Sequence, residues 1–539
     1  MDMGMAMQPK SAPRRPEVRR LPARSALALA LLAAGGAQAQ TYTVSPRIDA
    51  RLTWTDNASS SGVGGFGGRA GGEGGSDWIM ELSPGISMAR DAGRLNGTLA
   101  ASFRNIMYAS NSDRNTTYLS LNGAGEFEAI EKMLFIEADA SISRNNLSAF
   151  STRGSTDGLD VNSDNETRVF SLSPRFEFRI GDNTRGTARY RQRWSDSGNT
   201  SLANQNAGDW SFGLSNNEIT GIFGLGLDYN RSSSSYGGSS GGGGGSSTFS
   251  GGGKEQEIMR ATLYAKATPE LRLRGIVGRE SNDYGSRGKQ SNTVTGGGFD
   301  WNPTERTTIS GTVEKRIFGR GYDFSFQHRL ARTSFFMTFG RDIQSSLDTT
   351  AGGGLLDPLY ESLFNDPLLV ALYPDPLARR DAVLLLLRQL RGDVLTNAYF
   401  VNRSFSAGVT RSLPRGVLSF SVSRSDRSRL GNADELAAQD DFRSFDDIKS
   451  NTATLSYSHR LTPSTSLNTS VSRSNTEGSG TAGADTKRTM FTAGLTSSLG
   501  PNTTGALQYR YQRSDGDSSG LGTNDFSENA VTATVGVSF

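Results

Sequence analysis

The sequence predicts an all-β fold: a large up-and-down antiparallel transmembrane β-barrel of about 22 strands, within a range of 16 to 24. Three observations support this prediction. Apolar and polar side chains alternate along most of the chain, short turns alternate with long polar loops, and the last residue is an aromatic on an apolar row.

The first 39 residues have the pattern of a secretory signal peptide, which leaves residues 40–539 for the barrel. Basic residues from Lys10 to Arg24 precede the apolar run Ala26–Ala34, and a small-x-small cleavage site ends at Ala39. The apolar run is too short to span a bilayer. We therefore expect cleavage after this segment and delivery to the outer membrane of a Gram-negative bacterium.

The composition excludes several functional classes. The 539-residue chain has no Cys and 2 His, which excludes disulfide frameworks, thiolate metal sites and lipidation of an N-terminal cysteine. The formal charge of +3 belongs to the leader, because the remainder carries 51 basic and 52 acidic residues. A nucleic-acid partner therefore loses its main support, and we expect neither that partner nor a cofactor.

The alternation of side chains begins directly after the leader. From Tyr42 to Trp54 the even positions are mostly apolar, whereas the odd positions carry Arg47, Asp49 and Arg51. A period of two indicates a strand with one apolar and one polar face. The pattern recurs in the segments 78–88, 95–103, 119–129, 134–142, 170–180, 223–229, 259–267, 271–277, 309–313, 507–511 and 531–539.

The connections between these segments alternate in length. Tight turns are expected near 92–93, 131–132, 182–183, 269–270, 302–304, 414–415, 463–464 and 501–502. Long polar loops are expected at about 56–77, 146–166, 231–256, 344–397, 426–448, 476–486 and 515–526. Outer-membrane barrels place short turns at the periplasmic end and long loops at the extracellular end, so both chain ends should be periplasmic.

Aromatic residues mark the long-loop ends of the predicted strands. Six of eight such residues lie on the apolar row, as an interfacial girdle requires. Tyr108 and Tyr118 lie one position off their rows, which predicts either a bulge or an inward-facing ring. The eight residues are Trp54, Trp78, Tyr108, Tyr118, Phe170, Trp194, Trp210 and Tyr229.

The last strand carries Val535, Val537 and Phe539 on one apolar row. This ending resembles the C-terminal signal read by the outer-membrane assembly machinery, which we expect as a partner together with outer-membrane lipid and lipopolysaccharide. A barrel of about 22 strands has a lumen too wide for side chains to fill, so something must pass through it or block it.

Charged residues on the polar rows are candidates for lining the lumen. Of the 57 basic residues 49 are Arg, whose planar fork suits carboxylates and phosphates. One hypothesis is a lumen adapted to acidic solutes or an acidic polysaccharide. The alternative is cross-strand ion pairs that rigidify the wall, together with codon bias toward Arg. The candidates are Glu126, Glu128, Glu137, Asp139, Arg175, Arg179, Arg185, Arg189, Arg191 and Arg193.

One long loop contains a predicted helical insertion at residues 353–392. Three Asp-Pro pairs are typical of helix starts, and the third begins a helix at about 376–391. Its leucines require a packing partner, and its length excludes a membrane span. We expect a plug or lid over the barrel mouth, with Asp375, Pro376, Val383, Leu384, Leu387 and Leu390 as its defining residues.

No catalytic or metal-ligating residues emerge from the sequence. His328 and His459 share rows with apolar residues and should face lipid near the short-turn ends of their strands, where a general base would meet no substrate. We therefore expect no enzyme and no metal site.

Residues 301–342, WNPTERTTISGTVEKRIFGRGYDFSFQHRLARTSFFMTFGRD, resemble the outer-membrane barrel family associated with PEP-CTERM and exosortase systems. Residues 395–428 and the closing SENAVTATVGVSF are similar to it too. The resemblance implies a role in exopolysaccharide secretion, with exopolysaccharide or its export proteins as partners. It assigns no catalytic residues.

The sequence therefore leaves three functions open. The leading one is a conduit or accessory for exopolysaccharide export. The others are a general diffusion porin and a non-conducting structural or assembly partner of envelope polysaccharide machinery. A barrel hydrolase ranks fourth.

Overall fold

The computed structural model describes residues 42–58, 75–110, 112–144, 148–150, 166–197, 204–216, 221–237, 253–285, 288–345, 396–436, 440–481, 483–518, 522–523 and 525–539. Residues Thr43–Phe539 form one structural unit, and all of the packing described below belongs to it. The predicted leader, 1–39, lies outside the described residues.

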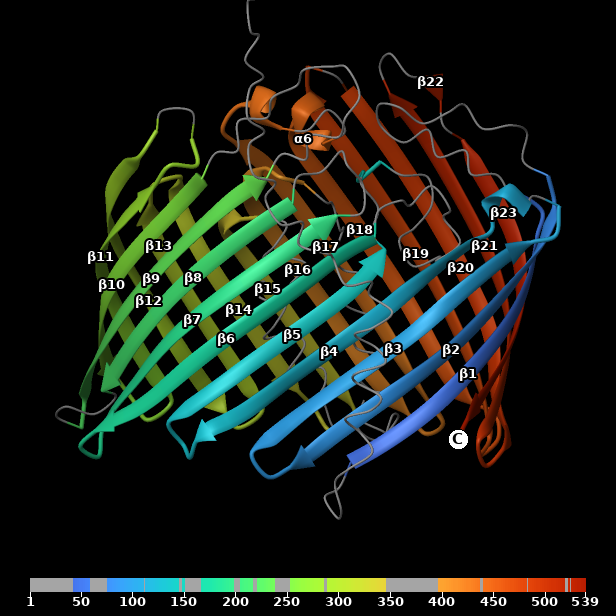
Figure 1. Ribbon diagram of the computed structural model, residues 1–539. Coiled ribbons are helices and arrows are strands. Elements are labelled where there is room, and N and C mark those ends of the chain that lie inside the picture. The colour runs from blue at the N-terminus through green and yellow to red at the C-terminus, as the bar shows by residue number, and fades with distance from the viewer. Residues whose placement is uncertain are drawn as a thin grey trace, which may run out of the picture. The chain divides into compact units, whose positions relative to one another are not determined.

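Within the described ranges, 22 strands form one closed antiparallel barrel, each strand pairing with its neighbours in the chain (Figure 1). The predicted up-and-down barrel is confirmed. The strands are β1 (Tyr42–Thr55), β2 (Asp77–Ala92), β3 (Leu95–Tyr108), β4 (Thr116–Ile130), β5 (Leu134–Arg144), β6 (Glu166–Ile180), β7 (Thr184–Ser197), β8 (Asn204–Asn216), β9 (Phe223–Gly237), β10 (Gly253–Lys266), β11 (Leu271–Asn282), β12 (Gln290–Thr304), β13 (Thr307–Arg316), β14 (Gly319–Arg329), β15 (Thr333–Gln344), β16 (Tyr399–Leu413), β17 (Gly416–Leu430), β18 (Phe445–Arg460), β19 (Thr465–Gly480), β20 (Gly483–Gly500), β21 (Thr503–Ser518) and β23 (Phe526–Ser538).

Helical structure is sparse in the described part of the chain. It consists of η1 (Ser112–Arg114), η2 (Ala433–Glu435) and α6 (Asp441–Ser444), and a two-residue strand, β22 (Gly522–Thr523), pairs with the end of β21. None of these helices is long and apolar enough to cross a membrane. The predicted helical insertion at 353–392, with its defining residues from Asp375 to Leu390, lies outside the described residues.

The first and last strands close the barrel. β1 and β23 pair over nine positions, from Arg47 with Ser538 to Thr55 with Ala530. Beyond this ladder, the N–H of Phe539 donates to the carbonyl of Pro46 at 2.9 Å. The seam therefore leaves no open edge, which a sheet surrounded by hydrocarbon cannot tolerate.

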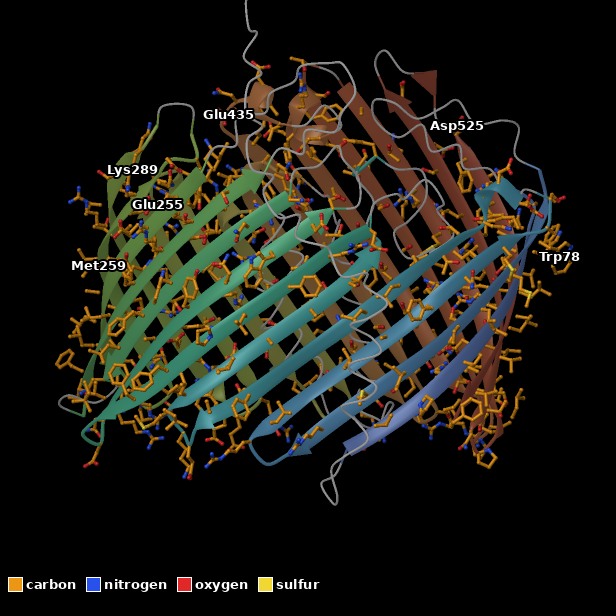
Figure 2. The ribbon with its side chains drawn as sticks, in the orientation of Figure 1. Trp78, Glu255, Met259, Lys289, Glu435 and Asp525 are labelled. Carbon is orange, nitrogen blue, oxygen red and sulfur yellow. The ribbon has the colours of Figure 1, made fainter. Side chains whose placement is uncertain are left out.

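The two faces of the wall have opposite chemistry. On β1, Leu52 is 45% exposed, whereas its neighbours Thr53 and Thr55 are buried on the inner face. Figure 2 shows Trp78 and Met259 projecting from the outer side of the wall. An outer row of exposed apolar side chains and a polar interior are the pattern of a barrel that spans a lipid bilayer.

Most of the predicted turns are confirmed, including the left-handed Gly93 (φ 71°) between β2 and β3. Two connections were predicted wrongly. The 302–304 turn lies later, at 305–306, because Pro303 has no N–H for the ladder and instead occupies a register shift within β12. The long loop at 476–486 is absent, since β19 and β20 continue to Gly480 and Gly483.

At Tyr108 and Tyr118 the sequence allowed either a β-bulge or an inward-facing ring. Tyr108 and Tyr118 are 4% and 8% exposed and pack with Ile79 and Ile106 in a small inner cluster. The inward ring is therefore correct at both positions. Outside, Trp78, Phe170, Trp194 and Trp210 are all exposed on the apolar row.

The expected assembly signal lies at the seam. Val535 pairs with Ala50, and Val537 with Ile48, while Phe539 is 69% exposed at the short-turn end. Recognition of these residues by assembly machinery stays a prediction.

An arginine on the outer face should destabilise the barrel more than one on the inner face of the same strand. Leu455 is 46% exposed between the outward Phe420 and Val471, whereas the next residue, Ser456, pairs with Ser419 and Ser470. We expect Leu455→Arg to lower the free energy of unfolding by about 2–4 kcal/mol, because a charge enters hydrocarbon. The control Ser456→Arg should change it by less than about 1 kcal/mol. Denaturant unfolding in lipid vesicles measures both, and equal losses would contradict this assignment of faces.

Candidate lumen site and extracellular mouth

The inner face of β4 to β7 carries an ion-pair network. Arg175 contacts Glu126 at 2.7 Å and Glu137 at 2.9 Å, and it also pairs with Glu177. Arg189, which faces Arg175 across the β6–β7 ladder, pairs with the same Glu137. A carboxylate shared by two guanidinium groups offsets their repulsion, so this part of the wall is braced.

Similar pairs occur around the barrel. Arg51 and Arg104 share Glu81, Arg272 and Arg274 share Asp300, and Arg510 pairs with Glu528. Ion pairs of this kind are therefore a general feature of the inner wall. For these arginines they fit the alternative in which cross-strand ion pairs rigidify the wall.

The other candidate residues have different surroundings. Arg193 pairs with Asp209 at 2.7 Å, and Asp139 accepts a hydrogen bond from Ser171 at 2.7 Å. Glu128 lies at the β4–β5 turn, where it accepts from the backbone N–H of Lys132. Arg191 donates to the hydroxyl of Ser173 at 3.3 Å and has no ion pair with a described residue.

Arg179 and Arg185 stand directly opposite each other at the short-turn end of the β6–β7 ladder. Both are exposed, and neither has an ion pair with any described residue. Like charges facing each other across a ladder are destabilising unless an anion lies between them. Together with Arg191 they form what we call the free arginine row: Arg179, Arg185 and Arg191.

A cavity of about 320 Å³ opens on the inner wall toward the long-loop end. Its inner-face lining includes Arg189, Arg191, Arg193 and Asp209 from β7 and β8. The opposite side is formed by Tyr284 of the β11–β12 loop, by Gln344 at the end of β15 and by Tyr399 at the start of β16. Arginine, amide and aromatic groups thus converge on one volume, which suits a polar anionic ligand.

The tyrosine side of this cavity bridges distant strands. The rings of Tyr284 and Tyr399 stack with centroids 3.9 Å apart and an interplanar angle of 11°. The hydroxyl of Tyr399 also contacts that of Ser234 on β9, although β10 to β15 separate β9 from β16 in the sheet. The mouth is therefore narrowed by strand ends that meet across the gap.

A short hairpin explains how these ends meet. β13 and β14 have 10 and 11 residues and are joined by a two-residue turn, so they end below their neighbours. Arg316, at the tip of β13, makes two 2.8 Å hydrogen bonds to the fully buried Glu280 of β11 and lies 3.4 Å from Asp342 of β15. This bridge draws β11 and β15 together over the hairpin.

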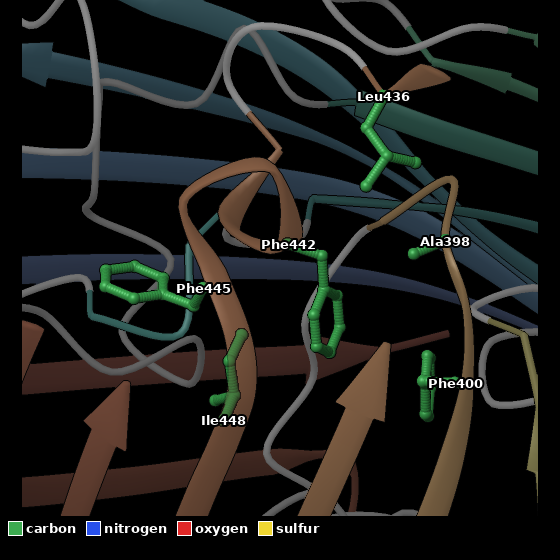
Figure 3. Close-up of a cluster of buried hydrophobic side chains, with 6 residues drawn as sticks. All are labelled: Ala398, Phe400, Leu436, Phe442, Phe445 and Ile448. Atoms are coloured by element: carbon green, nitrogen blue, oxygen red, sulfur yellow. The ribbon is translucent and has the colours of Figure 1, made fainter. Parts of the chain in front are cut away.

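A second contact crosses the mouth through α6. Phe442 of α6 is fully buried and stacks on Phe400 of β16, with ring centroids 5.6 Å apart. The rest of this mouth cluster is Ala398, Leu436, Phe445 and Ile448 (Figure 3).

The β5–β6 loop reaches the same cluster from the far side of the barrel. Its residue Phe150 lies 4.8 Å from Phe445, in space that is open because residue 478 is a glycine. Strands β7 to β17 separate this loop from α6 on one side and β19 to β4 on the other. Residues 148–150 of this loop therefore meet α6 from across the mouth.

Two adjacent buried carboxylates fasten α6 to the crossing segments. Asp440 accepts hydrogen bonds from the Thr396 hydroxyl and from the Asn397 and Phe442 N–H groups, at 2.8 to 3.0 Å. Asp441 accepts from the N–H of Ala149 at 2.7 Å. Burial, together with the neighbouring Asp440 charge, raises the pKa of Asp441 to about 7 against the opposing effect of hydrogen bonds from Ala149 and Ser148. Burial also raises the pKa of Asp440, against its hydrogen bonds and the charge of Arg429.

The sequence did not reveal this cluster. Most of its residues fall within the predicted loops 146–166 and 426–448, and Ala398 and Phe400 follow directly after the predicted loop 344–397. The one local signal was Asp440, a helix N-cap followed two residues later by an apolar side chain. Which loops meet depends on contacts between chain segments almost 300 residues apart, for which a single sequence carries no pattern.

The two histidines face outward, as expected. His328 contacts Thr307 and stacks near Phe335, which is exposed on the outer face. His459 contacts Tyr457 on the row of Leu455. Among the described residues, no group of three or more His, Asp or Glu is arranged to hold a metal ion.

No protein-family model matches the chain, and no curated protein matches it. Its fold is similar to that of several solved outer-membrane receptors. The ferric enterobactin receptor PfeA of Pseudomonas aeruginosa has 10% identity and a TM-score of 0.48, with 93% of this chain and 82% of that chain covered. The siderophore receptor PirA of Acinetobacter baumannii has 9% identity, a TM-score of 0.45 and coverages of 93% and 81%. The FrpB iron transporter of Neisseria meningitidis has 9% identity and a TM-score of 0.49, with 93% of this chain and 83% of that chain covered. At these values the likeness carries no argument about function.

The docking of the β5–β6 loop should weaken as the pH rises. Because docking raises the pKa of Asp441 above its ordinary value, the docked state binds the proton more tightly. Docking is therefore strongest at low pH and is lost as the pH rises through about 7. The side chain of Asp441→Asn stays neutral and can still accept from Ala149, so its docking should lose the part of the pH dependence that Asp441 causes and keep only the part that comes from Asp440.

Hydrogen exchange of the Ala149 amide measures this docking. We expect the ratio of wild-type to Asp441→Asn exchange rates to increase between pH 6 and 8, which cancels the intrinsic pH dependence of exchange. A ratio that stays constant over this range would contradict the assignment.

Proposed function

We propose that this chain is an integral outer-membrane barrel that serves as a conduit or accessory for the export of an acidic exopolysaccharide. The observation that carries the proposal is the free arginine row. Arg179 and Arg185 face each other at the short-turn end, with no ion pair to a carboxylate in the described part of the chain, and Arg191 continues the row toward the cavity. The polymer and its PEP-CTERM/exosortase association come from the family resemblance of residues 301–342 and 395–428.

The geometry suits a polyanion entering from the periplasm. A carboxylate of the polymer bound between Arg179 and Arg185 would offset the repulsion between their two guanidinium groups. Arg191 lies six residues beyond Arg185 on the same face, or about 20 Å along the strand. Two acidic units separated by several sugars on one extended chain could therefore be held at the two ends of the row.

The docking of described loop residues on α6 bears on the alternatives. A general diffusion porin needs a permanently open lumen, whereas here loops from opposite sides dock on α6. A non-conducting structural or assembly partner remains the second candidate, and the same docking favours it. The two candidates differ in one requirement: a conduit needs a mouth that opens, and a structural partner does not.

Localising the polysaccharide in a clean deletion strain tests the proposal. We expect polymer to accumulate in the periplasm and to disappear from the surface. Complementation with the double variant Arg179→Gln, Arg185→Gln should restore surface polymer only partly, because the capturing charges are gone.

The matched control is Arg411→Gln, an exposed arginine on the outward row near the short-turn end of β16. It should complement fully. Normal surface polymer in the deletion strain would overturn the proposed function.

A further inference from the structure

The inner-wall cavity has an unusual balance of charge. Two of its three β7 arginines are neutralised by partners in the wall: Arg189 by Glu137, and Arg193 by Asp209. Among the described residues, Arg191, between them, has one side-chain hydrogen bond, to the neutral hydroxyl of Ser173. Asp209 lies opposite Arg191 in the β7–β8 register, but its two oxygens are bound by Arg193 and Ser232. Two arginines therefore share one carboxylate, and the excess of one positive charge matches a ligand group with a single negative charge.

Arg231 also lines the cavity and is paired with Glu255 at 2.6 Å, and the remaining polar groups are neutral. The side chain of Asn230 has no hydrogen bond with any described residue, and the amide nitrogen of Gln344 has none either, since only its oxygen accepts, from Asn402 at 2.9 Å. Ser232 donates to Asp209 at 2.6 Å and keeps its hydroxyl oxygen as an acceptor. Amides and hydroxyls around one cation are suited to the hydroxyl groups of a sugar rather than to several phosphates.

The aromatic side supplies a flat surface. Tyr284 and Tyr399 are held as a stacked pair and fixed to Ser234 across the mouth, so their orientation is set before any ligand arrives. The apolar face of a pyranose ring packs on such a surface. A volume of about 320 Å³ lies at the small end of the range for ligand sites, about 300–1,000 Å³, which suits one or two sugar units.

We propose that this cavity is a subsite for a carboxylated sugar unit. The carboxylate is held by Arg191, the ring lies toward Tyr284 and Tyr399, and Asn230 and Gln344 bind hydroxyl groups. The inference rests on the proposed function, because it names the unit of the exported polymer that the lumen recognises. It places recognition in the long-loop half of the barrel, beyond the pair Arg179 and Arg185.

Calorimetric titration of the full chain in detergent tests the subsite. The probe is a galacturonic acid trisaccharide, and maltotriose is the neutral comparison. We expect the acidic trisaccharide to bind and maltotriose to bind at least tenfold more weakly. Arg191→Gln should weaken the acidic ligand by about tenfold to a hundredfold, the loss expected for one charge-assisted hydrogen bond. Arg191→Lys should bind the acidic trisaccharide with an affinity between those of the wild type and Arg191→Gln, because it retains the positive charge but loses the planar guanidinium group.

The control is Arg51→Gln on the opposite side of the lumen, which leaves Glu81 paired with Arg104. It should bind as the wild type does. Folding of each variant is checked by its heat-dependent shift in electrophoresis. Equal affinity for both trisaccharides, or unchanged binding by a folded Arg191→Gln, would overturn the subsite.

The two proposals fail separately. Polymer retained in the periplasm of the deletion strain, with unchanged binding by Arg191→Gln, would remove the subsite and keep the conduit. Normal surface polymer with Arg191-dependent binding would remove the conduit and keep the subsite.

Discussion

Inside a bilayer a backbone N–H or C=O has no water to pair with, and this constraint governs the whole molecule. The β1–β23 seam satisfies it by converting an open sheet into a closed wall. Closure with 22 strands in turn creates a lumen that side chains cannot fill, so the inner rows must be polar and their charges must find partners. The ion pairs around Glu137, Glu81 and Asp300 follow from that requirement.

Against this background of paired charges, the free arginine row stands out. A wall that pairs Arg175 and Arg189 through Glu137 has no structural reason to leave Arg179 facing Arg185. On β7, Arg189 and Arg193 likewise form ion pairs with carboxylates, whereas Arg191 contacts the hydroxyl of Ser173. At the other end, the short β13–β14 hairpin and the α6 cluster bring distant strand ends together, so access through the mouth depends on contacts that are not part of the ladder between neighbouring strands.

Local regularity explains what the sequence could predict. A period of two fixes the face of each residue, so the barrel, the outward histidines and most turns followed from residue order alone. The prediction of a loop at 476–486 was wrong because strand pairing continues beyond the apolar band through Ser, Thr and Gly. Strand residues that do not contact lipid need no apolar side chains, so the alternation is lost there. The cavity and the mouth cluster escaped prediction because β7, β8, β15, β16 and three loops supply them, and their meeting depends on the shape of the closed barrel.

The central claim is that uncompensated arginines make the lumen a path for anions. The reversal potential of single channels in a planar bilayer, under a potassium chloride gradient, measures it most directly. For the wild type at alkaline pH, where we expect the β5–β6 loop to undock, we predict anion selectivity. The triple variant Arg179→Gln, Arg185→Gln, Arg191→Gln should lose it at similar conductance. A cation-selective wild type, a selectivity that survives the triple substitution, or the absence of any conductance would contradict the account.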